Sequence, residues 1–124
     1  MTTQTPREVL ETLFERLADP ERRDSATELF TETATIRRPG ACFDGPNAPE
    51  AYVSAGDSRY RTIAKDVQRW IETDDEAVSI GTLYGVTADG EEFEGVRYVD
   101  IATVEDGRIS RLEIWNDIEV DGVV

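Results

Sequence analysis

The chain has 124 residues, 39% of them hydrophobic, and 27 acidic against 13 basic side chains give it a formal net charge of −14. This length predicts one domain over residues 1–124, with a core over about 6–118 and an acidic tail over 119–124. Nucleic acid and anionic membrane would both be repelled by such a surface, so neither is expected as a partner.

An N-terminal helix is predicted from its start signal. Thr5, Pro6 and Glu8 make a capping box with proline at the first helical position. Apolar residues at helical spacing follow: Val9, Leu10, Leu13, Phe14 and Leu17. Asp19 and Pro20 end this helix and begin a second one.

The second predicted helix is expected to bury three apolar residues: Ala26, Leu29 and Phe30. Arg22 and Arg23 are expected on its surface, in solvent. Residues 33–38 then alternate as a strand, which Pro39 and Gly40 end.

A third helix is predicted after a loop over residues 43–47. Asn47 and Glu50 repeat the capping-box pattern, and the helix is expected to run to about Ser58.

The C-terminal half predicts an antiparallel meander. Four strands are expected, over about 62–72, 76–87, 92–104 and 108–119. Asp89-Gly90 and Asp106-Gly107 separate the last three, and Asp-Gly between alternating apolar residues is a strong hairpin signal because glycine readily adopts positive φ. The order α-α-β-α-β-β-β-β predicts an α+β fold.

The composition also bears on the cellular location of the protein and on the salt conditions in which it works. No apolar run approaches the roughly 20 residues of a membrane span, and no secretory signal is visible, so a cytoplasmic location is expected. Cys42 is the only cysteine, which excludes an internal disulfide. Lys65 is the only lysine among the basic residues, and an acid-rich, lysine-poor surface favours a halophilic protein whose carboxylates stay hydrated in high salt.

The chain has no histidine, which limits its chemistry. Acid–base steps must use a carboxylate, a tyrosine or water, and Ser-His-Asp or Cys-His arrangements are excluded. No calcium-loop spacing is present, although an all-carboxylate Mg²⁺ or Ca²⁺ site is compatible with the composition. We predict no metal site and no cofactor.

Four short motifs stand in order along the chain: Phe30 with residues 34–39, Gly45, residues 106–109 and residues 114–117. With the order of elements, they resemble the nuclear transport factor two-like superfamily over nearly the whole chain. That group includes ketosteroid isomerases, SnoaL-type polyketide cyclases and limonene epoxide hydrolase. The resemblance implies a cone-shaped fold, in which a curved antiparallel sheet wraps the N-terminal helices and its open end forms a pocket. It also implies a homodimer formed through the sheet.

The resemblance further assigns individual positions. In the isomerase pattern the general base falls on Arg38, the oxyanion-hole tyrosine on Phe14 and the protonated aspartic acid on Asp100. Of these three groups this chain has only the aspartic acid, at Asp100, so isomerisation by that mechanism is not expected. The aspartate of the cyclase pattern falls on Asn116, with Asp117 adjacent. The epoxide hydrolase pattern also matches Asp117, but its arginine and second aspartate on an earlier strand are missing.

Arg38 and Asp100 form the most informative pair, because period-two alternation puts each on one face of its strand, with Tyr98 beside Asp100. Three interpretations are open. The two residues form a buried ion pair, or Arg38 binds a carboxylate, phosphate or enolate oxygen of a ligand, or Asp100 or Asp117 transfers a proton while Arg38 stabilises charge. The ligand-binding candidates are Arg38, Phe14, Tyr98 and Asn116.

We therefore expect a SnoaL-like protein that binds a small organic molecule in a mostly apolar pocket. As an enzyme it would be a cofactor-free isomerase, cyclase or hydrolase that uses a carboxylate. The alternative is a non-catalytic module for small-ligand binding or dimerisation. Fold alone does not choose between them.

Overall fold

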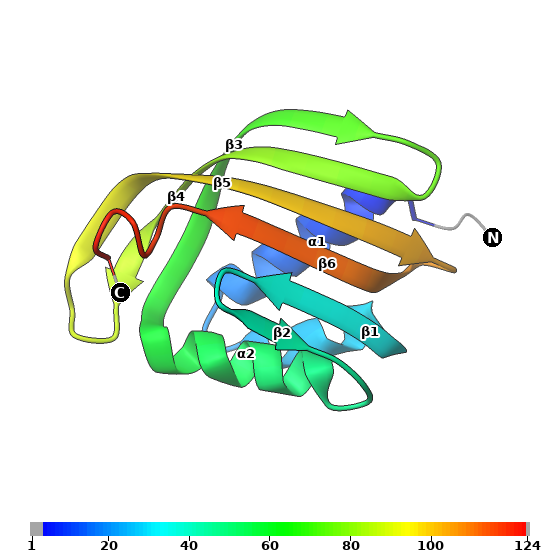
Figure 1. Cartoon of the computed structure of the whole chain (residues 1–124), viewed down its shortest axis with the longest axis horizontal. Helices are drawn as coiled ribbons and strands as arrows, with labels where there is room; N and C mark the ends of the chain where they lie inside the picture. Colours follow the sequence, from blue (N-terminus) through cyan, green and yellow to red (C-terminus); the bar gives the residue numbers. More distant parts are fainter. Residues whose placement is uncertain (1–3, 124) are drawn as a thin grey trace.

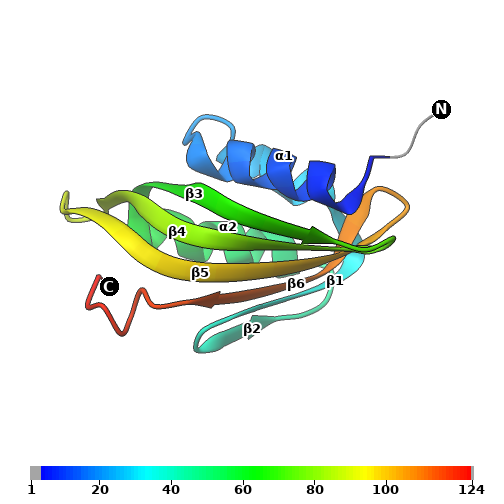
Figure 2. The same ribbon diagram turned by 90° about the horizontal axis from the view of Figure 1, so that it is seen from above.

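The computed structural model describes residues 4–123 and has the predicted α+β architecture (Figure 1). Its elements are α1 (Pro6–Ala18), the 3₁₀ helix η1 (Arg23–Leu29), β1 (Phe30–Arg38), β2 (Ala41–Phe43), α2 (Ala48–Arg59), β3 (Tyr60–Glu72), β4 (Glu76–Thr87), β5 (Glu92–Glu105) and β6 (Arg108–Asn116). The strands form one curved sheet, and α1 lies along one of its faces (Figure 2).

The six strands follow the order β2-β1-β6-β5-β4-β3. From β3 to β6 they pair antiparallel, as predicted, and Gly90 and Gly107 in the last two turns have φ angles of 91° and 81°. One pairing differs from expectation, because β1 runs parallel to β6, with Ile36 opposite Leu112. The chain passes through β2, α2 and three further strands between β1 and β6, and a connection of this length permits parallel pairing. The sheet is therefore mixed.

The capping box of α1 is confirmed. The Thr5 hydroxyl accepts a hydrogen bond from the Glu8 N–H at 3.2 Å, and the Thr5 N–H donates to the Glu8 carboxylate at 3.0 Å. The second capping box is wrong, because no side chain caps α2 at Asn47. The predicted second helix is a 3₁₀ turn, and Phe30 is buried as the first residue of β1 rather than on a helix. The short strand β2 was not predicted, since three residues are too few to show alternation.

The main core lies between α1 and the sheet. Val9, Leu10 and Leu13 of α1 are buried against sheet residues such as Ala102 and Leu112. A second cluster fills the space near the far ends of β3, β4 and β5: Tyr60, Leu83, Val96, Tyr98 and Ile118. The boundary between these two clusters is where the candidate site lies.

Two glycines of β4 allow β3 to lie close to it. A Cβ at Gly81 would overlap the backbone oxygen of Asp66, and one at Gly85 would overlap that of Thr62. The pairing of β3 with β4 shifts register on either side of these contacts. Such irregularities bend a strand, so the glycines contribute to the curvature of the sheet.

The described part of the acidic C-terminal tail is folded into hydrogen-bonded turns after β6. β6 ends at Asn116, three residues before its predicted end, and Ile118 is buried beyond it. The Asp121 N–H donates to the Asp117 carbonyl at 2.7 Å, and the Val123 N–H donates to the Ile118 carbonyl at 3.0 Å. No helix within residues 4–123 is long and apolar enough to cross a membrane.

Candidate functional site

A cavity of about 90 Å³ opens between α2, the C-terminal end of α1 and the inner face of the sheet. Its wall is largely apolar: Leu17, Val53, Ile63, Leu83, Ile114 and Ile118. Five of its polar groups come from strands, namely Arg38, Lys65, Tyr98, Asp100 and Asn116. Other polar lining residues lie on η1, α2 and the C-terminal tail, among them Arg23, Arg59 and Glu119. Pockets for drug-sized ligands are about 300–1,000 Å³, so this cavity suits a molecule of only a few non-hydrogen atoms.

Strand alternation explains why these polar groups converge. Arg38 on β1, Asp100 on β5 and Asn116 on β6 each continue the inward-facing series of their strand. Asn116 lies opposite Tyr98 in the ladder between β5 and β6. Four of the predicted site residues therefore do come together at one cavity, namely Arg38, Tyr98, Asp100 and Asn116.

Asp100 is paired with Lys65, not with Arg38. Its Oδ2 lies 3.6 Å from the Lys65 Nζ, and the two side chains are 4% and 13% exposed. The other oxygen, Oδ1, is buried and has no hydrogen-bond partner among the described residues. Burial raises the pKa of Asp100, and the nearby Lys65 ammonium opposes that rise. Of the three interpretations left open by the sequence, the buried ion pair between Arg38 and Asp100 is therefore wrong.

Aromatic rings surround the lysine. The Lys65 Nζ lies 4.3 Å from the centre of the Phe14 ring and 5.4 Å from that of Tyr98, and the two rings meet edge to face. Phe14 thus contacts the lysine and does not line the cavity itself. The hydroxyls of Tyr98 and Ser79 share a buried hydrogen bond of 2.6 Å. Burial raises the pKa of Tyr98 to about 12, so its hydroxyl is neutral at physiological pH.

Arg38 differs from the other cations of the cavity wall. Lys65 is paired with Asp100, Arg59 with Glu119 at 3.6 Å, and Arg23 with Asp57 at 2.7 Å. By contrast, the Arg38 guanidinium donates only to the neighbouring Pro39 carbonyl at 3.2 Å and has no carboxylate partner within residues 4–123.

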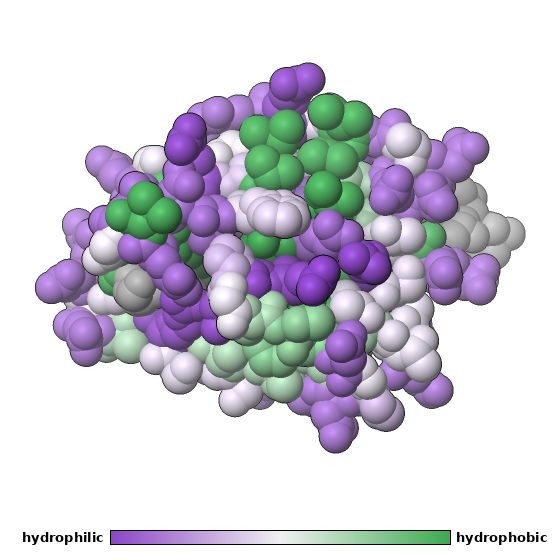
Figure 3. Space-filling view, viewed as in Figure 1, coloured by the Kyte–Doolittle hydropathy of each residue, from purple (hydrophilic) through white to green (hydrophobic). Residues whose placement is uncertain are grey.

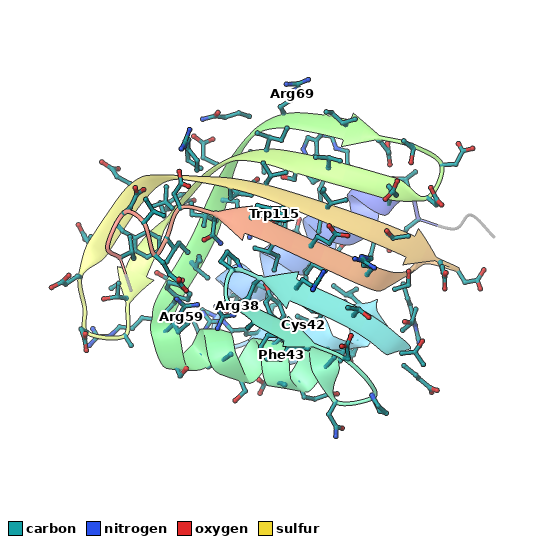
Figure 4. All side chains as sticks on the ribbon, in the orientation of Figure 1. Arg38, Cys42, Phe43, Arg59, Arg69 and Trp115 are labelled. Atoms are coloured by element: carbon teal, nitrogen blue, oxygen red, sulfur yellow. The ribbon has the colours of Figure 1, made fainter. Side chains whose placement is uncertain are left out.

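Figure 4 shows where this unpaired cation lies. Arg38 and Arg59 are on the same side of the molecule, near the C-terminal half of α2, and both line the cavity. An excess of cationic groups at one end of an otherwise apolar cavity attracts an anion.

Of the two neighbouring polar residues at the end of β6, Asn116 and Asp117, only Asn116 faces the cavity. Asn116 lines the cavity, and its Oδ1 accepts a hydrogen bond from the Ile118 N–H at 3.2 Å. The Asp117 carboxylate lies outside the cavity and accepts a hydrogen bond of 2.7 Å from Arg97, an exposed residue of β5. Asp117 is therefore placed away from the other candidate catalytic residue, Asp100.

The sequence analysis did not place two of the residues that line the cavity, Lys65 and Arg23. Lys65 was considered only in the composition, although its place between Ile63 and Val67 in an alternating strand was a usable signal. Arg23 was expected in solvent but is 6% exposed. It donates three hydrogen bonds, to the Leu17 carbonyl at 3.0 Å, the Asp57 carboxylate at 2.7 Å and the Arg61 carbonyl at 3.0 Å.

No metal centre is evident in the described part of the chain, because no three acidic or cysteine side chains cluster to hold an ion there. Cys42 is exposed on β2, where its Sγ lies 3.6 Å from an Asp44 oxygen.

The chain belongs to the SnoaL-like domain family, which matches residues 10–112. No curated protein matches it significantly. Among solved structures it is similar to an NTF2-like protein of unknown function from an Exiguobacterium species, with 25% identity, a TM-score of 0.71, and 88% of this chain and 98% of that one covered.

Two further structures share the fold at lower identity. A candidate SnoaL-like polyketide cyclase from a Jannaschia species has 18% identity and a TM-score of 0.76, with 98% of this chain and 94% of that one covered. A hypothetical protein of ketosteroid isomerase-like fold from Catenulispora acidiphila, solved with trimethylamine, has 13% identity and a TM-score of 0.75, with 90% and 85% covered. These likenesses establish the nuclear transport factor two-like fold.

Proposed function

We propose that the protein binds a small organic acid in the cavity, with Arg38 as the group that holds its carboxylate. The single observation that carries this proposal is the guanidinium of Arg38, which lines an apolar cavity without a carboxylate partner among the described residues. Arginine binds carboxylates through two parallel hydrogen bonds, and such charge-assisted bonds are the strong ones. The apolar wall accommodates the aliphatic part of the ligand.

The catalytic form of the proposal uses Asp100 as the proton-transfer group. Asp100 lines the same cavity as Arg38, and its Oδ1 has no hydrogen-bond partner among the described residues. A buried carboxyl with a raised pKa is suited to acid–base work near neutral pH. The reaction would then be a cofactor-free isomerisation, cyclisation or hydrolysis. A non-catalytic binding module is the alternative, and it requires no turnover by the Lys65–Asp100 pair.

The Arg38→Gln variant tests the binding role. We expect it to lose about 1.5–3 kcal/mol of affinity for short carboxylic acids, the value of a hydrogen bond to a charged group. Isothermal titration of a panel of short carboxylates at low salt measures this loss. Arg37→Gln is the matched control, because Arg37 is the exposed neighbour on the opposite face of β1 and should leave affinity unchanged. Equal affinities for both variants would contradict the assignment.

A homodimer formed through the outer face of the sheet is also proposed. Figure 3 shows apolar side chains gathered on this face among hydrophilic ones. Trp115 of β6 is 60% exposed and Ile71 of β3 is 42% exposed there. Arg37, Arg69 and Arg97 lie on the same face, so two copies of this very acidic chain repel one another least across it.

Trp115→Glu is expected to convert this dimer to a monomer. The substitution removes an aromatic contact and adds a negative charge on each side of a two-fold interface. Sedimentation equilibrium measures the mass. Val120→Glu, at an 86% exposed position on the C-terminal turn, is the control and should leave the mass unchanged. A monomeric wild-type protein would refute the interface.

A further inference from the structure

The chain's only lysine lies inside the candidate site, although every other basic residue is an arginine. The Lys65 side chain is 13% exposed and its amine is enclosed by the rings of Phe14 and Tyr98 and by Asp100. Arginine keeps its proton in proteins and is no nucleophile, whereas a lysine amine is the side chain that forms Schiff bases with carbonyl compounds. We propose that Lys65 forms an imine with a small aldehyde or ketone in the cavity, a role that rests on the proposed ligand binding there.

Asp100 is placed to carry the protons of this reaction. It is 3.6 Å from the amine, 4% exposed, and its Oδ1 lacks a hydrogen-bond partner within residues 4–123. The Asp100 carboxylate is the acidic group beside the Lys65 amine, so we assign to it the proton that the ammonium gives up when the carbonyl ligand is bound. The transfer leaves a neutral amine beside a carboxylic acid.

The reaction balances without a co-reactant. The amine nitrogen of Lys65 bonds to the carbonyl carbon while the C=O π pair moves to oxygen, which takes the proton from Asp100. The nitrogen returns a proton to the Asp100 carboxylate, giving a neutral carbinolamine. Asp100 then protonates the hydroxyl, the C–O bond breaks, and water leaves as the nitrogen lone pair forms C=N. The ammonium ion and the ketone have become a protonated imine and one water.

The cavity points to a short 2-oxo acid as the ligand class. Its volume of about 90 Å³ admits only a few non-hydrogen atoms. An oxo acid matches both polar features, because its carboxylate suits the unpaired Arg38 and its carbonyl suits the amine of Lys65. Pyruvate is a suitable probe, and lactate is its counterpart without a carbonyl group.

The test compares two amines in one molecule. Arg22→Lys adds an exposed amine just before η1, outside the sheet face that is proposed for the dimer. Folded protein is incubated with pyruvate and sodium cyanoborohydride at pH 7, and peptide mass spectrometry follows the reduced adduct at both positions. Accessibility alone predicts faster labelling at position 22. We expect faster labelling at Lys65, by about a hundredfold if Asp100 gives the ordinary benefit of acid–base assistance. Equal or slower labelling at Lys65 overturns the proposal.

A second measurement detects the imine without requiring cyanoborohydride to reach the cavity. Imine formation and hydrolysis replace the ketone oxygen, so the wild type is expected to speed loss of ¹⁸O from labelled pyruvate, and Lys65→Arg to abolish this. Exchange that survives Lys65→Arg overturns the imine. Thermal shifts with lactate separate the two proposals. Stabilisation by lactate without exchange or labelling refutes the imine alone, whereas no response to either acid refutes ligand binding as well.

Discussion

Replacing Lys65 with methionine is expected to destabilise the protein by about 3–5 kcal/mol at pH 7, because it leaves the buried charge of Asp100 without a partner. The variant keeps most of the side-chain volume, so the loss reports the charge. Urea denaturation measures the free energy of unfolding. The double variant Lys65→Met with Asp100→Leu is the control and should recover most of the loss, since it removes both charges. A double variant as unstable as the single one would contradict the electrostatic cause.

The same loss is expected to shrink as the pH falls. Burial raises the pKa of Asp100 above its ordinary 3.8, so the folded chain binds this proton more readily than the unfolded chain. The destabilisation from the charged form is therefore fully present above the folded pKa and disappears as the pH falls through it toward 3.8. The difference in unfolding free energy between wild type and Lys65→Met should therefore decrease as the pH is lowered from 7 toward 3.8, and urea denaturation across this range measures it.

Arg23→Met is expected to cost about 2–6 kcal/mol, because two backbone carbonyls lose a donor at about 1–3 kcal/mol each. Those carbonyls, of Leu17 and Arg61, belong to the end of α1 and the start of β3, so Arg23 joins segments distant in sequence. Its pair with Asp57 adds little, since that carboxylate is 47% exposed.

Arg22→Met is the matched control for this prediction. Arg22 is the exposed neighbour of Arg23, and surface substitutions usually change stability by less than about 0.5 kcal/mol. Thermal and urea denaturation of both variants give the comparison. Equal losses for the two variants would show that the hydrogen bonds of Arg23 do not stabilise the fold.

Several features of the fold could be predicted because their causes are local. The capping box needs only Thr5 and Glu8, and the last two hairpins need a glycine after an aspartate. Alternation in β1 and β5 placed Arg38 and Asp100 on inward faces, and the family resemblance pointed to Asn116 or Asp117, of which Asn116 lines the cavity. These signals depend on neighbours within a few residues, so they survive without knowledge of the whole fold.

The pairing of charges was decided by the tertiary structure. Alternation assigns Asp100 to a face but cannot say which cation on that face is within reach, because that depends on strand order and curvature. Lys65 on β3 is two strands away from Asp100 on β5, and the curved sheet brings its long side chain across β4 to the carboxylate. Arg23 is a similar case, since its buried acceptors lie on segments that only folding brings together. The sequence by itself determined the elements and their faces, and the packing of distant elements determined which charged groups meet.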